Sequence, residues 1–291
     1  MQNFSFRLQG FFFAIVGALC VATLCLVSAA GRAQAPSTTG SVRSQQDQAA
    51  DDALLNKARA LYYSSAKAGL AGFDCTVHPD WMATFVSANP GTTISNNDPR
   101  LVLLNRVAMV LHANLKNGST TLDWAAPTGA LTADQTTLLD QMHSGIQQSL
   151  GGFIQFWTPF VDGSVIPDNS SGLAVTHTAS GITFHAAAAA DGTSVTEVFS
   201  NDLLLEHYDV VMSGTSIKFD PSYKATPQGL LVEHFVADIQ KADDPSAPVQ
   251  KMIVAVQYQT VEGFPIPSQL NMEVVGSGVM NMTLSQCTVQ R

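Results

Sequence analysis

The sequence is short of charge and of reactive patterns. Asp, Glu, Lys and Arg make up 13% of its 291 residues, and 14 residues are basic. The basic residues form no cluster, which argues against nucleic acid and against an anionic membrane surface as partners. The sequence also contains no H-E-x-x-H, G-x-S-x-G, P-loop or C-x-x-C pattern. Metal, dinucleotide and serine-hydrolase sites therefore lack a motif, and we predict no catalytic residue, no metal site and no cofactor.

A short apolar run, residues 11–27, opens the chain after Arg7. Small residues follow it up to Ala35, in the A-x-A-like order that precedes a signal-peptidase cut. The pattern predicts a signal peptide over residues 1–35, with cleavage after Ala29 as the rival, and therefore a periplasmic or secreted protein. A membrane anchor is the alternative reading, although a run of about 17 residues lies at the lower limit for a span.

Cysteine is scarce as well, and two of the four cysteines, Cys20 and Cys25, lie in the predicted signal peptide. We predict that Cys75 and Cys287 form one disulfide, because exported proteins meet oxidising conditions. Closing a loop of 212 residues (287 minus 75) contributes at most about 5 kcal/mol in the chain-entropy model. Strict alternation puts Cys287 on the polar side of its strand, so the bridge requires a bulge near Gln286 or a sheet edge. Two separate buried thiols are the alternative.

The exported part is acidic and apolar. Loss of residues 1–35 removes Arg7 and Arg32, so 14 minus 2 leaves 12 basic residues against 23 acidic ones. Apolar residues make up 46% of the chain, which suffices for one large core. Residues 36–50 are small and polar and predict a disordered linker. We therefore expect a single domain over residues 51–291, present as a monomer.

Two amphipathic helices are expected. Residues 51–68 place apolar side chains on one face at the 3.6-residue period. Thr132 and Gln135 make a capping box at the start of the second helix, whose apolar stripe leads to a glycine pair at residues 151–152. The glycines end or bend this helix, and the aromatic segment after them is a candidate for a lid or for the core.

Alternating apolar and polar residues predict strands in most of the remaining chain. Strands separated by short connections form antiparallel meanders, and a parallel sheet would require long crossovers. One apolar and one polar face indicate a sheet that is covered on a single side. In the C-terminal half the expected strands are 173–178, 182–189, 194–200, 203–212, 216–220, 230–239, 252–260, 269–275 and 279–289. The fold class is therefore α+β, with one large antiparallel sheet and two main helices.

The segment GFPIP, residues 263–267, is expected to be a stiff turn between two of these strands. Pro265 and Pro267 cannot donate hydrogen bonds to a sheet, and Ile266 is held extended by the proline that follows it.

Two stretches resemble the lipoprotein-localisation carriers of the LolA/LolB-like class. Residues 58–81, ARALYYSSAKAGLAGFDCTVHPDW, are similar to the starting helix and first strand of such proteins, and residues 257–274, QYQTVEGFPIPSQLNMEV, to their strand-turn-strand. The resemblance implies a curved sheet, an incomplete β-barrel, whose concave apolar face is covered by helices and holds acyl chains. The surroundings of Arg106 do not match the functional arginine of the family, so no site residue is carried over.

The predicted function is to shelter an apolar small molecule or lipid, such as an acyl chain, with peripheral contact to the cell envelope. Large aromatic residues and adaptable methionines suit such a lining, although ordinary core packing is the favoured explanation, because apolar faces are mostly buried by default. The candidate lining residues are Met109, Met142, Phe153, Phe156, Trp157, Phe160, Met272 and Met282.

Two other functions stay open. His78 and Asp80 in the segment HPDW would serve an exported hydrolase as base and orienting acid, although a turn in which Asp80 caps the next residues explains them as well. A structural component of the envelope without a ligand is the third reading. A nucleophile within reach of His78 would favour the hydrolase, and an apolar cavity would favour the carrier.

Overall fold

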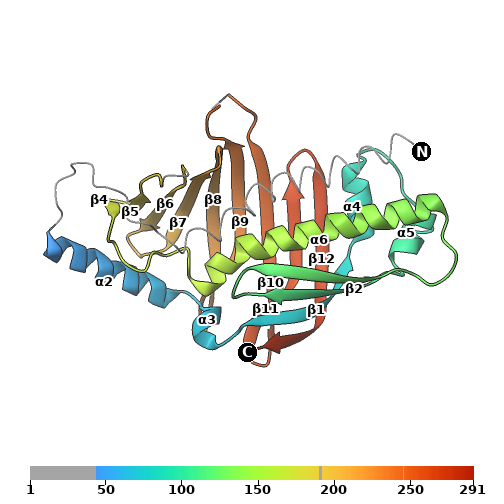
Figure 1. Cartoon of the computed structure of the whole chain (residues 1–291), viewed down its shortest axis with the longest axis horizontal. Helices are drawn as coiled ribbons and strands as arrows, with labels where there is room; N and C mark the ends of the chain where they lie inside the picture. Colours follow the sequence, from blue (N-terminus) through green and yellow to red (C-terminus); the bar gives the residue numbers. More distant parts are fainter. Residues whose placement is uncertain (1–43, 190–191, 245) are drawn as a thin grey trace. The chain divides into compact units, whose positions relative to one another are not determined.

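The computed structural model describes residues 44–189, 192–244 and 246–291. Their strands form one antiparallel sheet of 12 strands in the order β3-β2-β1-β12-β11-β10-β9-β8-β7-β6-β5-β4 (Figure 1). The sheet is not closed, because β3 and β4 lie at its two ends. The predicted fold class, α+β with an open antiparallel sheet, is confirmed.

The helices and strands account for most of the described chain. The helices are α2 (Gln45–Leu61), α3 (Ser65–Ala68), α4 (Trp81–Ala88), α5 (Pro99–Leu104) and α6 (Ala133–Asp162). The strands are β1 (Gly72–Pro79), β2 (Ala108–Asn114), β3 (Ser119–Ala125), β4 (Leu173–His177), β5 (Gly181–Ala186), β6 (Ser194–Ser200), β7 (Leu205–Met212), β8 (Thr215–Thr226), β9 (Gly229–Lys241), β10 (Gln250–Val261), β11 (Phe264–Val274) and β12 (Gly278–Gln290).

The N-terminal expectations are partly outside the described residues and partly wrong. The predicted signal peptide, residues 1–35, lies outside them, as does the predicted linker up to residue 43. From Gln45 the expected linker is helical instead, because the Ser44 hydroxyl accepts from the Asp47 N–H at 3.1 Å and caps α2. The helix expected over residues 51–68 ends at Leu61, since Tyr62 turns extended and bridges Leu230 of β9.

The capping box at the start of α6 is confirmed. The Thr132 N–H donates to Gln135 Oε1 at 2.9 Å, and the Gln135 N–H donates to Thr132 Oγ1 at 3.3 Å. The helix then runs through the glycine pair at residues 151–152 and ends at Asp162. The glycines therefore do not end this helix.

The Pro-x-Pro segment lies inside β11 and not in a turn, which corrects the expectation. The turn falls one step earlier, at Glu262 and Gly263, whose φ angles are 49° and 91°. Pro265 and Pro267 pair with β10, while the pairing of β11 with β12 begins at Gln269. The missing N–H groups thus lie where β11 has one described neighbour, which is where a strand tolerates proline.

The chain forms two compact units. Among the described residues the first unit contains 65–158 and 252–291, and the second contains 44–64 and 159–251. The prediction of one domain over residues 51–291 stays a prediction.

Candidate functional site

The eight candidate lining residues are all buried. None exposes more than 4% of its surface. Phe160 lies in the second unit, where its ring contacts Tyr208, Phe219 and Phe235 at centroid distances of 6.2 Å. The other seven lie in the first unit, so the candidate site is taken there.

Strand register places the three first-unit candidates that lie on strands, Met109, Met272 and Met282, on one face of the sheet. Phe73 of β1 contacts the Trp157 ring of α6 at 6.2 Å, which identifies the face that α6 covers. Directly opposed residues of antiparallel strands share a face. Cys75 shares the face of Phe73 by alternation and is opposed by Leu111, two residues from Met109.

The same rule carries this face to the C-terminal strands. Val77 of β1 opposes Leu284 of β12, and Met282 lies two residues before it. Met282 opposes Leu270 of β11, which lies two residues before Met272. The sequence pattern thus identified one continuous apolar face, while its role in holding a ligand stays a prediction.

Helix α6 changes character along its length. Its first half, residues 133–150, is amphipathic, with Met142 and Ile146 buried and Asp140 and Gln147 exposed. From residue 152 most side chains are buried, including Phe153 and Trp157, whose rings stack at 5.8 Å. A helix buried on nearly all sides belongs to a core, whereas an amphipathic one covers a face. The aromatic segment is therefore core, and the first half of α6 is the cover.

Several polar atoms on the buried parts of α6 have no hydrogen-bond partner among the described residues. They are His143 Nε2, Ser149 Oγ, Gln155 Oε1 and Thr158 Oγ1. Leaving such an atom buried and unpaired costs about 1–3 kcal/mol. One hydrogen bond does join the helix to the sheet, since Trp157 Nε1 donates to Tyr258 Oη at 2.9 Å. The contact between α6 and the sheet therefore depends mainly on apolar packing.

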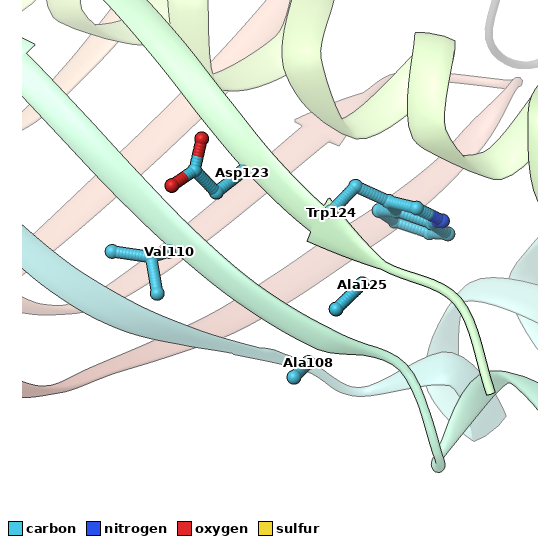
Figure 2. Close-up of a pocket in the computed structure, with 5 residues that line it drawn as sticks. All are labelled: Ala108, Val110, Asp123, Trp124 and Ala125. Carbon is cyan, nitrogen blue, oxygen red and sulfur yellow. The ribbon is translucent and has the colours of Figure 1, made fainter. Parts of the chain in front are cut away.

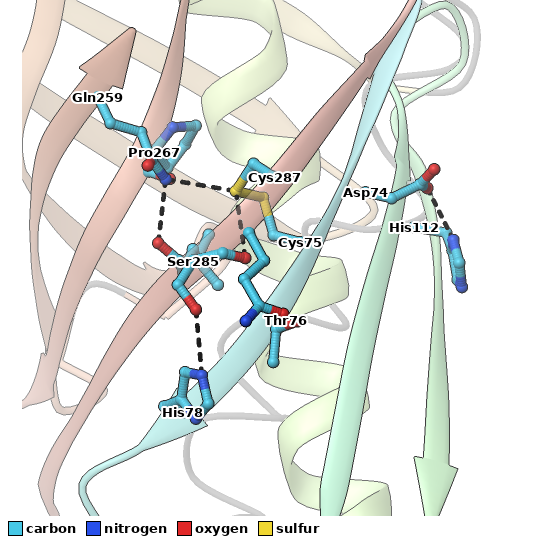
Figure 3. Close-up of a disulfide and its surroundings, with 11 residues drawn as sticks. Asp74, Cys75, Thr76, His78, His112, Gln259, Pro267, Ser285 and Cys287 are labelled. Carbon is cyan, nitrogen blue, oxygen red and sulfur yellow. Dashed lines mark hydrogen bonds and ion pairs between the residues drawn. A yellow bond between two sulfur atoms is a disulfide. The ribbon is translucent and has the colours of Figure 1, made fainter. Parts of the chain in front are cut away.

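The opposite face of β1 and β12 carries the histidine of the hydrolase reading. His78 Nε2 lies 3.1 Å from Ser285 Oγ, so a hydroxyl is within reach of this ring (Figure 3). Asp80 does not orient His78, because its carboxylate caps α4 by accepting from the Ala83 N–H at 2.9 Å. No carboxylate among the described residues bonds the His78 ring. The pair thus lacks the third group that activates a serine nucleophile.

A second histidine on this face is bonded to two carboxylates. His112 Nδ1 lies 2.7 Å from Asp74 Oδ1, and His112 Nε2 lies 3.1 Å from Asp123 Oδ2. The hydrogen bond to Asp74, and next the one to Asp123, raise the pKa of His112. Sequence reasoning missed this cluster, because its members come from β1, β2 and β3 and only the strand register brings them together.

The predicted disulfide is present, and β1 pairs with β12 as the bridge requires. Cys75 and Cys287 are joined with Cα atoms 4.2 Å apart (Figure 3). The register shifts between Asp74 and Thr76, and Gln286 has a φ of 50°. A bulge here is one of the two arrangements that could reconcile the alternation of β12 with the bridge, and it turns Cys287 toward the buried Cys75.

Gln259 of β10 makes hydrogen bonds to β11 and β12 beside the bulge. Its Nε2 donates to Leu284 O at 3.0 Å and to Pro267 O and Cys287 Sγ at 3.3 Å (Figure 3). The amide therefore joins β10, β11 and β12 where the prolines interrupt the ladder.

A shallow hollow of about 280 Å³ lies on the last two strands at the β3 end of the sheet (Figure 2). Ala108, Val110, Asp123, Trp124 and Ala125 line it. The Trp124 ring turns to α6 and stacks on His143 at 5.0 Å, so the open side of the hollow presents two alanines, a valine and one carboxylate.

The described residues contain no cluster of His, Cys, Asp and Glu arranged to hold a metal ion. None of their helices has the length and apolar character needed to cross a membrane. No protein-family model, curated protein or solved structure matches the chain.

Proposed function

We propose that this protein is an exported carrier that shelters an apolar ligand, such as a lipid acyl chain, beneath the first half of α6. The supporting observation is the combination of an apolar sheet face with an amphipathic helix that covers it through few polar contacts. The resemblance of residues 58–81 and 257–274 to lipoprotein-localisation carriers points the same way.

The ligand would lie against β2 and β3, in the place that side chains of α6 now occupy. Met109, Leu111 and Leu122 supply a buried apolar strip on these strands. Met142 and Ile146 of α6 are buried as well. An acyl chain that replaced them would keep the strip dry, and each buried methylene would contribute about 0.8 kcal/mol.

Displacement of the helix would also relieve an existing cost. His143 Nε2 and Ser149 Oγ are buried without partners among the described residues, and water would satisfy both once the helix moved. The apolar stretch after residue 152 is core in this mechanism and would stay in place. The moving part is therefore residues 133–150.

A lock on α6 tests the proposal. The Trp124 ring of β3 stacks on the His143 ring of α6 at a centroid distance of 5.0 Å, so cysteines at these two positions can be joined by a short thiol-reactive cross-linker. The Trp124→Cys/His143→Cys protein, once cross-linked, should fail to take up a fluorescent fatty acid that the wild type binds. Each single variant, with its thiol alkylated, should still bind it.

The carrier proposal is abandoned if wild-type protein takes up no fluorescent fatty acid and carries no lipid by native mass spectrometry when it is purified from cell envelopes. Equal uptake by the locked and unlocked proteins would instead reject the helix as the moving part. Thermal unfolding of each variant checks that the cross-link has not disrupted the fold.

A second candidate, an exported hydrolase, is favoured by the 3.1 Å distance between His78 Nε2 and Ser285 Oγ. A fluorophosphonate probe should label Ser285 if this serine is activated, and the label should disappear in Ser285→Ala and His78→Gln. Absence of labelling in the wild type removes this candidate.

A further inference from the structure

We infer that the free edge of β3 is a docking site for an extended segment of a partner polypeptide, with a basic side chain opposite Asp123. The inference is independent of the carrier proposal, because it concerns the end strand and the face of the sheet away from α6. It rests on the sheet edge, the hollow beside it and the charge at that place.

The end strand β3 has an unpaired edge among the described residues, because the sheet order begins with it. Natural sheets usually protect such an edge with proline, with charged side chains (lysine above all), with a bulge or with a very short strand. The seven residues of β3, STTLDWA, include neither proline nor lysine, and their single charged residue is Asp123. Its register with β2 is continuous from Ala108–Ala125 to Asn114–Ser119, without a bulge. The edge is therefore open to a further strand.

The other end of the sheet is different. β4 has five residues. His177, its last residue, is bonded at 2.9 Å to Asp51 of α2. A short strand that is tied to a neighbouring helix is a poorer template, so the inference concerns β3.

The hollow lies where side chains of an added strand would fall. Its floor consists of two cross-strand pairs, Ala108 with Ala125 and Val110 with Asp123. On an added strand, the residues opposite Asp123 and Ala125 would point to this same face, with Cβ separations of about 4.5–5.5 Å. The small side chains at residues 108 and 125 leave room for an apolar residue from the partner.

The negative charge at this place favours a basic residue on the partner strand opposite Asp123. Two carboxylates, Asp74 and Asp123, flank the single imidazole of His112, so the cluster keeps at least one negative charge when that ring is protonated. The Asp123 side chain is 79% exposed and faces solvent. A second copy of this acidic chain would bring the same negative charge, whereas a lysine or arginine complements it. The segment that fits has a basic residue and, two positions away, a small or medium apolar residue.

Synthetic peptides test the inference on the intact protein. The probe is a seven-residue Thr/Val peptide with one lysine and a valine two positions away, and a second peptide carries glutamate in place of lysine. The lysine peptide should bind and should protect β3 amides from hydrogen exchange. Methylation of alternate peptide nitrogens should abolish binding, because an added strand depends on its backbone hydrogen bonds.

Charge reversal gives the sharpest comparison. Asp123→Lys should reverse the preference between the two peptides, and Asp123→Asn should weaken the lysine peptide about two- to fivefold, as for an exposed ion pair. Asp243→Lys, in an exposed turn of the second unit, is the matched control and should change neither affinity. Unfolding midpoints of all variants establish that they are folded.

Three results would overturn the inference. The first is no binding of either peptide, and the second is equal binding before and after Asp123→Lys. The third is a dimer in analytical ultracentrifugation whose β3 amides are already protected, because a second copy would then occupy the edge.

Discussion

The contacts that stabilise each of the two compact units differ in kind. In the first unit a disulfide joins β1 to β12 and an apolar helix face covers the sheet. In the second unit α2 is fastened to its neighbours largely by polar groups. Asp52 accepts from the Ser170 N–H and hydroxyl at 2.6 and 2.7 Å, and Arg59 donates to Pro167 O. Both units bury an apolar core, so the contrast is between the covalent bond of the first unit and the side-chain hydrogen bonds that hold α2 in the second.

Close backbone packing reinforces this difference. In the second unit, residues 61–63 lie directly against Gly229 at the start of β9, and the Tyr63 N–H donates to Leu230 O at 3.0 Å. The Tyr62 hydroxyl accepts from the Leu205 N–H at 2.7 Å. Small additions to tightly packed side chains or backbone should therefore destabilise the second unit. The stability of the first unit should depend most on its disulfide.

Removal of the disulfide should have the largest effect. Cys75→Ala/Cys287→Ala should lower the free energy of unfolding by about 2–5 kcal/mol, because the bridge closes a long loop in the unfolded chain. Native-state hydrogen exchange should show the loss in β1 and β12 first, with β8 and β9 retaining their protection. An equal loss of protection in all four strands would show that the two units unfold together.

A methyl group at Gly229 should come next. A Cβ there would lie 2.6 Å from Tyr63 N and 2.8 Å from Tyr62 C, and the residue has a φ of 121°. We expect Gly229→Ala to cost roughly 2–4 kcal/mol, from strain and from the backbone clash. Gly214, with a φ of 75° and no atom within 4 Å of such a Cβ, is the matched control. Urea unfolding should show a clearly smaller loss for Gly214→Ala, and equal losses would exclude the clash.

Two adjacent tyrosines give an internal comparison of hydroxyl groups. Tyr62→Phe should cost about 1–3 kcal/mol, because it leaves the buried Leu205 N–H without its acceptor. Tyr63 Oη is buried without a partner among the described residues, and burial raises the pKa of Tyr63 to about 12. Tyr63→Phe should therefore be neutral or stabilising in thermal unfolding. The opposite order of the two variants would contradict the assigned hydrogen bonds.

The smallest effect should be a pH dependence in the first unit. Because Asp74 and Asp123 raise the pKa of folded His112, its stabilisation is fully present below the unfolded value near 6.5 and is lost as pH rises through the folded pKa. The difference in unfolding free energy between wild type and His112→Gln should thus be larger at low than at neutral to high pH. A difference that does not vary with pH would remove the charge contribution of His112.

Part of the structure could be predicted from the sequence alone. The alternation of apolar and polar residues sufficed for an antiparallel sheet with one covered face, since the period of two depends on neighbouring positions along each strand. The capping box of Thr132 and Gln135 is equally local. The Cys75–Cys287 pair was predicted from number and context, and the alternation of β12 left two ways to form it, a bulge near Gln286 or a sheet edge, of which the structure has the bulge.

The tertiary structure decided the rest. The extended residue Tyr62 ends α2 early because it pairs with Leu230, and the prolines of β11 lie in a strand because β12 does not pair with them there. Asp74, His112 and Asp123 meet only through the register of three strands. Such contacts join residues far apart in the chain, so no local period or motif encodes them. They are fixed when the strands align and the apolar face is buried.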